Sequence, residues 1–342
     1  MFQHLLIHSI SAFKGERTEA AIYHMLVGKR SSQTFQDIHA YNLTSLFGIC
    51  RSLKREELHQ ELLDLQAKGF ILEEQGQYLV TSHGLSEIQR DTVESIQWLN
   101  GLQYHQMDQL FWSRFLLFVQ TASNIEQGQN QFIPIDERKE ILQWVKTKYQ
   151  HEKHDLQNLL DHLYNEIHDL FSQFPSWLAE FLTQRMTGVH RYGLSKEQLA
   201  FHFDLKKLDV DVYLTSAIHF LLHNVLNAPQ SYPFLFGFCN DLVQELPITQ
   251  SAKKTLELLR KGHPFETITR IRRLKTSTIQ DHVVEIALVD PSFSVEQFVS
   301  TEAVQNISRV ANHLNTNKLK VIKEALEDDY SYFQIRLVLA SQ

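Results

Sequence analysis

Apolar residues recur at helical spacing through most of the chain, and three short stretches of this kind follow one another over residues 251–290. Their predicted inward-facing residues are Ala252, Leu256 and Leu259 in the first stretch, Phe265, Ile268 and Ile271 in the second, and Ile279, Val283 and Ile286 in the third. Gly262 and Pro264 separate the first two stretches, as expected for a helix end followed by a helix start. The pattern predicts a helix-turn-helix.

The turn before the third helix is predicted at Leu274 and Lys275. Three hydroxyl residues follow it, and such side chains commonly cap the free amides of a helix start: Thr276, Ser277 and Thr278. We expect Ser277, Thr278, Gln280, Asp281 and His282 to face outward from the third helix. A helix of this kind fits the major groove of DNA.

The first hundred residues predict a winged-helix-like module. Helical patterns over residues 16–26, 35–42, 44–51 and 54–68 precede two β-prone runs in residues 70–80, with Gly76 at the turn between them. The helix in the recognition position is rich in acids, namely Glu56, Glu57, Glu61 and Asp64. Because DNA phosphates would repel these carboxylates, we interpret this module as a site for protein docking rather than a simple DNA reader.

The middle of the chain is predicted to be helical. Residues 136–174 have apolar positions at helical spacing throughout, and Ser195 with Gln198 forms a capping-box pattern at the start of a later helix. Near the end of this region, four aromatic residues are interpreted as part of a core: Tyr232, Phe234, Phe236 and Phe238. The alternative is an exposed patch for a partner.

These patterns predict an all-α, mainly helical protein with a small N-terminal β-hairpin wing. We predict three domains: the winged-helix-like module at residues 1–100, a helical domain at 101–250, and the helix-turn-helix domain at 251–342. A chain of 342 residues with 43% hydrophobic residues has enough apolar content for several cores. Its 12 Gly and 7 Pro imply no long disordered tract.

Cysteine and hydropathy patterns indicate a cytoplasmic protein. The only cysteines, Cys50 and Cys239, form no metal-binding pattern and suit a reducing compartment. The N-terminal residues lack the basic start and long apolar region of a secretory signal. No uncharged apolar run approaches the roughly 20 residues of a membrane helix, so we expect no membrane partner.

Positive charge is concentrated in the predicted helix-turn-helix. Residues 251–282 have eight Lys and Arg residues against three acids, a net charge of +5 in a chain whose net charge is −7. This local charge is typical of a surface that binds a polyanion, so double-stranded DNA is the expected partner. The predicted contact residues are Arg270, Arg272, Arg273, Lys275, Ser277, Thr278, Gln280 and His282.

Sequence patterns of catalysis are not found. No Gly-rich phosphate-binding loop and no G-x-S-x-G nucleophile pattern occurs, and we predict no catalytic residues, no cofactor and no metal. His151 and His154 lie three residues apart, but the H-E-x-x-H pattern of zinc enzymes needs four. We interpret them as ordinary surface residues.

Two ends of the chain resemble known families. LLRKGHPFETITRIRRLKTSTIQDHVVEIALVD (residues 258–290) and LKVIKEALEDDYSYFQIRLVLA (residues 319–340) are similar to the helicase-associated helix-turn-helix domain at the ends of some bacterial RecQ-type helicases. AIYHMLVGKRSSQTFQDIHAYNLTSLFG (residues 21–48) resembles the start of YpbB-type proteins, which carry this domain without a helicase motor. The resemblance implies a DNA-binding partner of a RecQ-like helicase.

The predicted function is therefore a non-enzymatic DNA-binding accessory protein that tethers a RecQ-like helicase to its substrate in DNA repair or recombination. A second contact with DNA would raise the local concentration of the motor. Two alternatives stay open: a sequence-specific transcription regulator, and a pure protein–protein adaptor whose helix-turn-helix touches no DNA.

Overall fold

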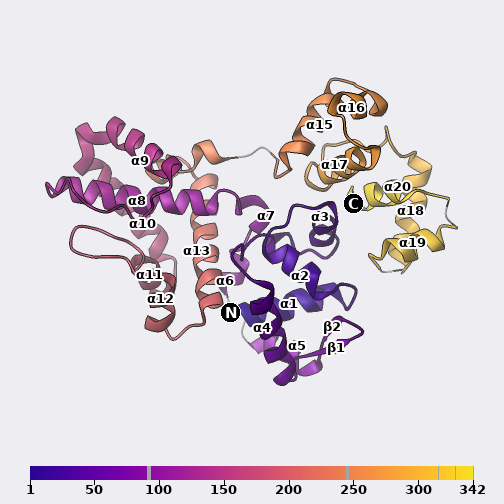
Figure 1. Cartoon of the computed structure of the whole chain (residues 1–342), viewed down its shortest axis with the longest axis horizontal. Helices are drawn as coiled ribbons and strands as arrows, with labels where there is room; N and C mark the ends of the chain where they lie inside the picture. Colours follow the sequence, from indigo (N-terminus) through magenta and orange to yellow (C-terminus); the bar gives the residue numbers. More distant parts are fainter. Residues whose placement is uncertain (91–93, 244–245, 315, 328, 342) are drawn as a thin grey trace. The chain divides into compact units, whose positions relative to one another are not determined.

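A computed structural model describes residues 1–90, 94–243, 246–314, 316–327 and 329–341, and these residues are mainly helical (Figure 1). Their strands form one antiparallel hairpin near the N-terminus. The predicted fold class, mainly helical with a small N-terminal hairpin and a C-terminal helix-turn-helix, is confirmed.

The described residues group into two compact units that do not follow the order of the sequence. One unit contains residues 94–243 together with Met1 and Phe2, and the other contains residues 3–90 and 246–341. The winged-helix-like residues and the helix-turn-helix therefore belong to the same unit. This association between the two ends of the chain was not expected from the sequence.

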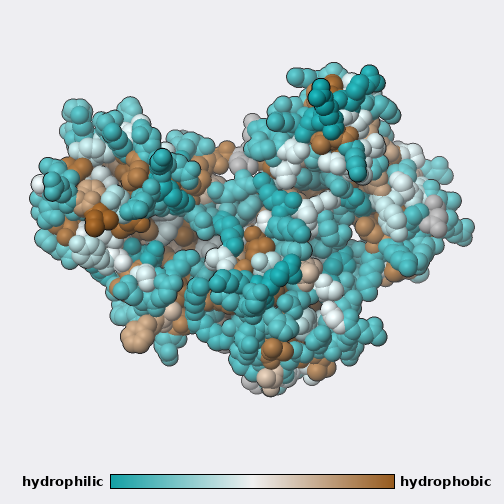
Figure 2. All heavy atoms as spheres, in the orientation of Figure 1, coloured by the Kyte–Doolittle hydropathy of each residue, from teal (hydrophilic) through white to brown (hydrophobic). Residues whose placement is uncertain are grey.

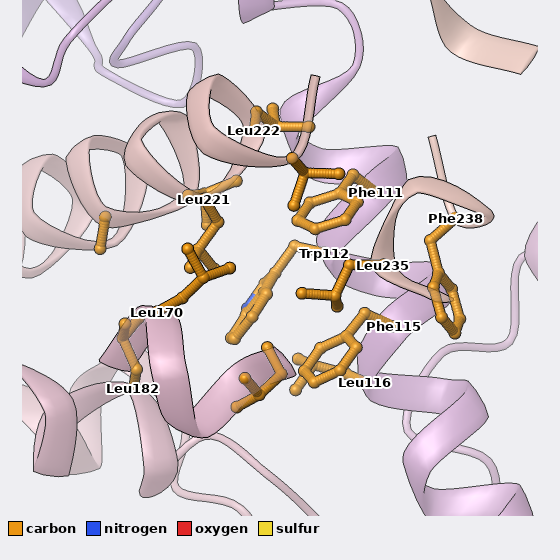
Figure 3. Close-up of a cluster of buried hydrophobic side chains, with 14 of the residues drawn as sticks. Phe111, Trp112, Phe115, Leu116, Leu170, Leu182, Leu221, Leu222, Leu235 and Phe238 are labelled. Carbon is orange, nitrogen blue, oxygen red and sulfur yellow. The ribbon is translucent and has the colours of Figure 1, made fainter. Parts of the chain in front are cut away.

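The unit of residues 94–243 is a helical body with an aromatic core (Figure 3). Its helices are α6 (Glu94–Gln97), α7 (Gly101–Tyr104), α8 (Asp108–Glu126), α9 (Lys139–Glu152), α10 (Leu156–Ser172), α11 (Ser176–Thr183), α12 (Lys196–His202), α13 (Lys207–Asn227) and α14 (Pro233–Phe236). Residues 136–174 are mainly helical, as predicted, but a short 3-10 turn at Lys153–Asp155 separates α9 from α10. The predicted capping box at Ser195 and Gln198 is confirmed at the start of α12.

The aromatic cluster after α13 belongs to this core, as predicted. Phe238 is 1% exposed, and its ring contacts those of Phe118 and Trp144 at centroid distances of 5.3 Å. The guanidinium of Arg114 donates to both carboxylate oxygens of Asp241, at 2.6 and 2.9 Å, and to the carbonyl of Phe238. This buried arginine therefore holds the segment that follows α14 against α8.

The second unit begins with the N-terminal elements. They are α1 (Phe2–Phe13), α2 (Glu19–Leu26), α3 (Ser32–Ala40), α4 (Arg55–Ala67), β1 (Ile71–Glu74), β2 (Gln77–Val80) and α5 (Ser82–Arg90). Ile71 pairs with Val80, and the strands turn at Gln75 and Gly76, which both have positive φ, as a tight hairpin requires. The helix predicted at residues 44–51 is wrong, because only a 3-10 turn at Thr44–Leu46 forms there.

The C-terminal elements complete this unit. They are α15 (Gln250–Arg260), α16 (Phe265–Arg272), α17 (Thr276–Val289), α18 (Thr301–Leu314), α19 (Leu319–Ala325) and α20 (Tyr332–Ala340). Val283 and Val284 of α17 share a buried cluster with Ile307, Ile322 and Ile335 from the three helices that follow. The helix-turn-helix therefore continues into a larger helical core.

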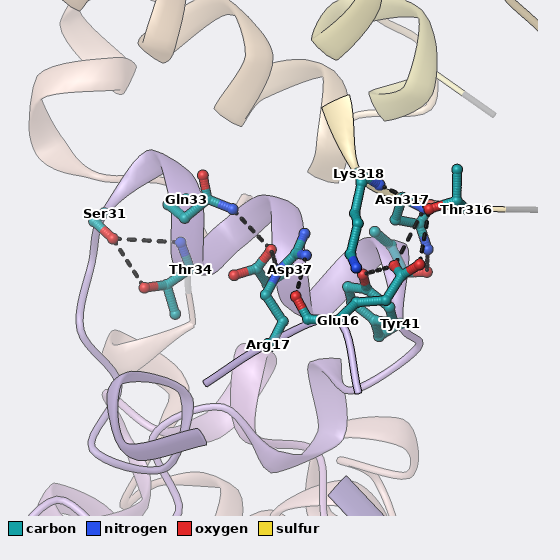
Figure 4. A network of polar contacts seen from close by, with 11 residues as sticks. Glu16, Arg17, Ser31, Gln33, Thr34, Asp37, Tyr41, Thr316, Asn317 and Lys318 are labelled. Carbon is teal, nitrogen blue, oxygen red and sulfur yellow. Dashed lines mark hydrogen bonds and ion pairs between the residues drawn. The ribbon is translucent and has the colours of Figure 1, made fainter. Parts of the chain in front are cut away.

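Hydrogen bonds join the N-terminal and C-terminal parts of this unit (Figure 4). Helix α3 packs against α17 and α20. Close to the N-terminus of α19, the carboxylate of Glu16 accepts a hydrogen bond from the Thr316 hydroxyl at 2.7 Å and one from the Tyr41 hydroxyl. The side-chain amide of Asn317 donates to the carbonyl of Ala40 at 2.9 Å. These polar contacts fix the α19 segment beside α3.

Candidate nucleic-acid interface

The core of the helix-turn-helix forms from the positions that helical spacing predicts. Ile268 of α16 and Ile279 and Val283 of α17 are each 0% exposed, so their predicted burial is confirmed. Ile271 is an exception, because 51% of its surface is exposed on the last turn of α16. That helix ends one residue later, at Arg272.

The turn between α16 and α17 has a conformation that depends on Arg273. This residue adopts the left-handed region, with φ of 51°, and ends α16 without a glycine. Lys275 is the N-cap of α17, and its carbonyl accepts from the amides of Thr278 and Ile279. No side chain caps this helix, so the predicted capping by the hydroxyl cluster is wrong. Thr276 and Ser277 lie instead in the first turn of α17, both exposed.

Arg270, Arg273 and Lys275 are the exposed basic residues of this turn. Among the described residues, no carboxylate forms an ion pair with these three side chains, so their charges are open to solvent. The amides at the start of α17 point the same way as the helix dipole, and both favour an anion. The arrangement presents cations, hydroxyls and amide donors together.

Arg272 differs from its neighbours because its guanidinium is engaged within the fold. It donates to the Ser251 carbonyl and the Thr255 hydroxyl, both at 2.8 Å, and to the Ser251 hydroxyl at 3.0 Å. The side chain therefore ties the C-terminus of α16 to the first turns of α15. Ser251 and Thr255 lie four residues apart on α15, a polar pair that sequence reasoning did not single out.

His282 does not face outward, which corrects the expectation from the sequence. It is 7% exposed, and its Nδ1 lies 2.9 Å from the Thr255 hydroxyl that also accepts from Arg272. Burial lowers the pKa of His282, and the nearby charge of Arg272 lowers it further. The imidazole is therefore a neutral core group rather than a group that contacts bases.

Most of α17 is enclosed by other helices. Residues 282–287 are all buried, since α15, α3 and α20 pack around this part of the helix. Asp281 is paired with Arg336 of α20 at 2.6 Å, and Arg336 also donates to Ser32 of α3. The sequence suggested that α17 fits the major groove of DNA. Because most of it is enclosed, it cannot lie along a groove over its full length. The N-terminal residues of α17 are the accessible part, with Thr276 and Ser277 exposed and Thr278 and Gln280 half-buried.

Further cations lie on α15. Lys253, Lys254, Arg260 and Lys261 are exposed, and Arg260 makes a long pair with Asp290 at 3.8 Å. The space-filling view shows mainly hydrophilic side chains over α15 and α16 (Figure 2). The helix-turn-helix therefore has a polar, basic exterior over an apolar core.

The described residues offer neither a metal site nor a membrane-spanning helix. No group of three or more His, Cys, Asp or Glu side chains there is placed to hold a metal ion. No helix formed by these residues has both the length and the apolar character required to span a membrane.

Comparisons with known proteins agree with this geometry. The family described as a helix-turn-helix domain matches residues 251–339, which span α15 to α20. Protein YpbB of Bacillus subtilis (strain 168) is 30% identical over 346 residues, an alignment that covers 100% of this chain and 97% of YpbB. No solved structure matches the chain. The helix-turn-helix suggests DNA binding, and at this identity over its full length the chain belongs to the YpbB family.

Proposed function

We propose that this protein binds double-stranded DNA without catalysis and tethers a RecQ-like helicase to its DNA substrate, as an accessory factor in repair or recombination. The main observation in support of DNA binding is the exposed basic turn at the start of α17, which no side chain caps. Its residues are Arg270, Arg273 and Lys275. Such groups suit phosphate oxygens, which supply affinity with little dependence on sequence.

The burial of α17 supports this proposal over a sequence-specific regulator. Base reading needs side chains that reach the floor of a groove, and His282 is unavailable because it is buried. Gln280 is half-buried, and Asp281 is paired with Arg336. The groups that stay open are mainly those that contact phosphates.

The proposal that the protein tethers a helicase is supported by the sequence resemblance and by the acidic composition of helix α4 in the N-terminal module. The C-terminal residues resemble a domain found at the ends of RecQ-type helicases, whereas this chain has no phosphate-binding loop with which to drive a motor itself. Helix α4 has four acids against one base, Arg55, a composition that does not favour phosphate binding, although Glu61 is buried and only Glu56 among these acids is exposed. We therefore assign partner docking to the N-terminal and middle residues, and we propose a cytoplasmic location.

A salt titration of DNA binding tests the DNA half. The variant Arg270→Ala/Arg273→Ala/Lys275→Ala should weaken binding on two unrelated duplexes alike in fluorescence anisotropy. The slope of log affinity against log salt should fall by about 2.7, at about 0.9 for each phosphate contact. The matched control is Lys139→Ala/Lys146→Ala/Lys153→Ala, which removes three exposed cations from the other unit.

The same titration separates the alternatives. A loss confined to one duplex sequence would indicate base reading and a transcription regulator. Absence of any DNA binding at low salt would indicate a pure adaptor. A pull-down of the full chain from native cell extract, with identification by mass spectrometry, tests the helicase half, and it is refuted when no RecQ-like helicase is enriched.

A further inference from the structure

An open groove of about 670 Å³ lies in the second unit, away from the basic turn of the helix-turn-helix. One side is formed by α2 and α3 with the loop between them, and the other by the segment that begins α19. Its volume is within the range of about 300–1,000 Å³ typical of ligand sites. Both sides belong to the same compact unit, so the groove is part of one body.

The inner surface of the groove is partly apolar. Ala20 and Ala21 contribute small half-buried side chains from α2. Leu319 and Val321 face them from α19, and 39% of the Val321 side chain is exposed. Small residues on one side and branched residues on the other leave room for apolar side chains of a ligand.

The rim of the groove is positive. Lys29, Lys318 and Lys320 line it, while its one acid, Asp37, is already paired with Arg17 at 2.8 Å. Lys320 makes only a long contact with Glu324, at 3.8 Å and largely exposed to solvent, which contributes little. The Glu16 carboxylate lies near Lys318, so Lys29 and Lys320 are the least compensated cations of the rim.

His24 lines the groove and lies between two cations, Lys29 of the rim and Arg55, which is not part of the groove lining. The Nε2 of His24 lies 3.4 Å from the Lys29 ammonium and 3.2 Å from an Arg55 guanidinium nitrogen. Burial lowers the pKa of His24, and these two charges lower it further. Among the described residues, no carboxylate forms a salt bridge with Lys29 or Arg55. A bound anionic group would relieve their mutual repulsion.

We propose that this groove binds an acidic amphipathic helix of a partner protein. The apolar side chains of such a helix would pack on Ala20, Ala21 and Val321, and its Asp or Glu residues would pair with Lys29 and Lys320. DNA phosphates would satisfy the cations but would leave the apolar surface in contact with water. This inference rests on the proposed docking role of the N-terminal module and specifies the chemistry of its partner.

A peptide selection with the intact protein tests the proposal. A phage-displayed library of random 16-residue peptides is selected on the full chain, and the enriched peptides are synthesised and titrated. We expect sequences with net negative charge and apolar residues at i, i+3 or i+4 and i+7. Lys29→Glu/Lys320→Glu should weaken their binding at least tenfold. The control Lys139→Glu/Lys146→Glu makes the same change of charge in the other unit and should leave their binding unchanged.

A second variant tests the apolar contact. Val321→Asp replaces an exposed residue, so the fold should persist, and circular dichroism verifies this. Val321→Asp should also weaken binding of the selected peptides, whereas Arg270→Ala/Arg273→Ala/Lys275→Ala should leave that binding unchanged. Failure to enrich acidic peptides, or equal binding by Lys29→Glu/Lys320→Glu, overturns the groove assignment while leaving the DNA titration unaffected. Loss of duplex binding in Lys29→Glu/Lys320→Glu, without loss of peptide binding, assigns the rim to DNA instead.

Discussion

Arg272 and Arg273 are adjacent in the chain and have different roles. The Arg272 guanidinium donates to Ser251 and Thr255 of α15, while Arg273 is exposed in the turn. Arg272 is the last residue of α16 and faces α15, whereas Arg273 leaves the helix with a left-handed backbone and faces solvent. Sequence reasoning grouped both as phosphate contacts, because charge alone does not show which arginine has acceptors nearby.

Arg272→Ala should therefore destabilise the second unit more than Arg273→Ala. Arg272→Ala removes a charged donor and leaves the Ser251 carbonyl and the Thr255 hydroxyl without its hydrogen bonds. This loss should lower the free energy of unfolding by about 1–3 kcal/mol. Arg273→Ala changes an exposed side chain and should alter the free energy of unfolding by less than about 0.5 kcal/mol. Urea unfolding followed by circular dichroism measures both; equal values would show that the Arg272 contacts contribute nothing.

His282 should make stability depend on pH. Its pKa is lower in the folded protein than the ordinary 6.5, so the unfolded chain binds a proton more readily. The stability that the neutral imidazole provides is complete above pH 6.5 and is lost as the pH falls below that value. Burial raises the pKa of Glu285, one turn further along α17, so the comparison needs a variant.

The measurement is urea unfolding at pH 7.5 and pH 5.5 for the parent chain and for His282→Gln, which has no titrating ring. We expect the parent to lose more stability than the variant over this interval. A parent whose loss matches that of the variant would mean that His282 titrates with an ordinary pKa.

At the scale of elements, the sequence predicts what local chemistry determines. Helical spacing located α15 to α17, and Gly76 located the hairpin turn, where its φ is 78°. The errors lie where contacts with a neighbouring element determine the local structure. Residues 44–51 form only a 3-10 turn at Thr44–Leu46, and the enclosure of α17 by α3 and α20 has no periodic signature in the sequence. For this reason the open basic turn was predictable, whereas the burial of His282 was not.

Two isoleucines of the helix-turn-helix make a matched pair for testing its core. Ile279→Ala should cost about 2–5 kcal/mol, because Ile279 is 0% exposed and its loss leaves a cavity. Ile271→Ala should cost less than about 0.5 kcal/mol, because Ile271 is 51% exposed. Equal costs would mean that the helix register is misassigned.

The detection method matters for these variants. All four tryptophans, Trp98, Trp112, Trp144 and Trp177, lie in the unit of residues 94–243. Tryptophan fluorescence therefore reports that unit, and its midpoint should be the same in both isoleucine variants. The circular dichroism transition reports both units and should move only for Ile279→Ala.

At the scale of the whole molecule, the N-terminal and C-terminal residues share one unit, although some 150 residues of the other unit separate them in sequence. The division of the chain into domains at residues 100 and 250 stays a prediction about independent folding. An N-terminal truncation would expose the faces of α17 and α20 on which α3 packs. Point substitutions are therefore a cleaner test of docking than deletion of the module.

This shared unit predicts that damage to the N-terminal part spreads to the helix-turn-helix. Ile38 lies on α3 and is 0% exposed, so Ile38→Ala should leave a cavity in the helix that packs against α17 and α20. Hydrogen–deuterium exchange with mass spectrometry on the full chain should then show faster exchange in peptides from α17 and α20 as well as from α3. Peptides from α8 and α13, which belong to the other unit, should exchange as in the parent. Faster exchange confined to residues 3–90 would show that the two parts open independently, and the groove beside α19 would then lack the rigid support that its proposed ligand requires.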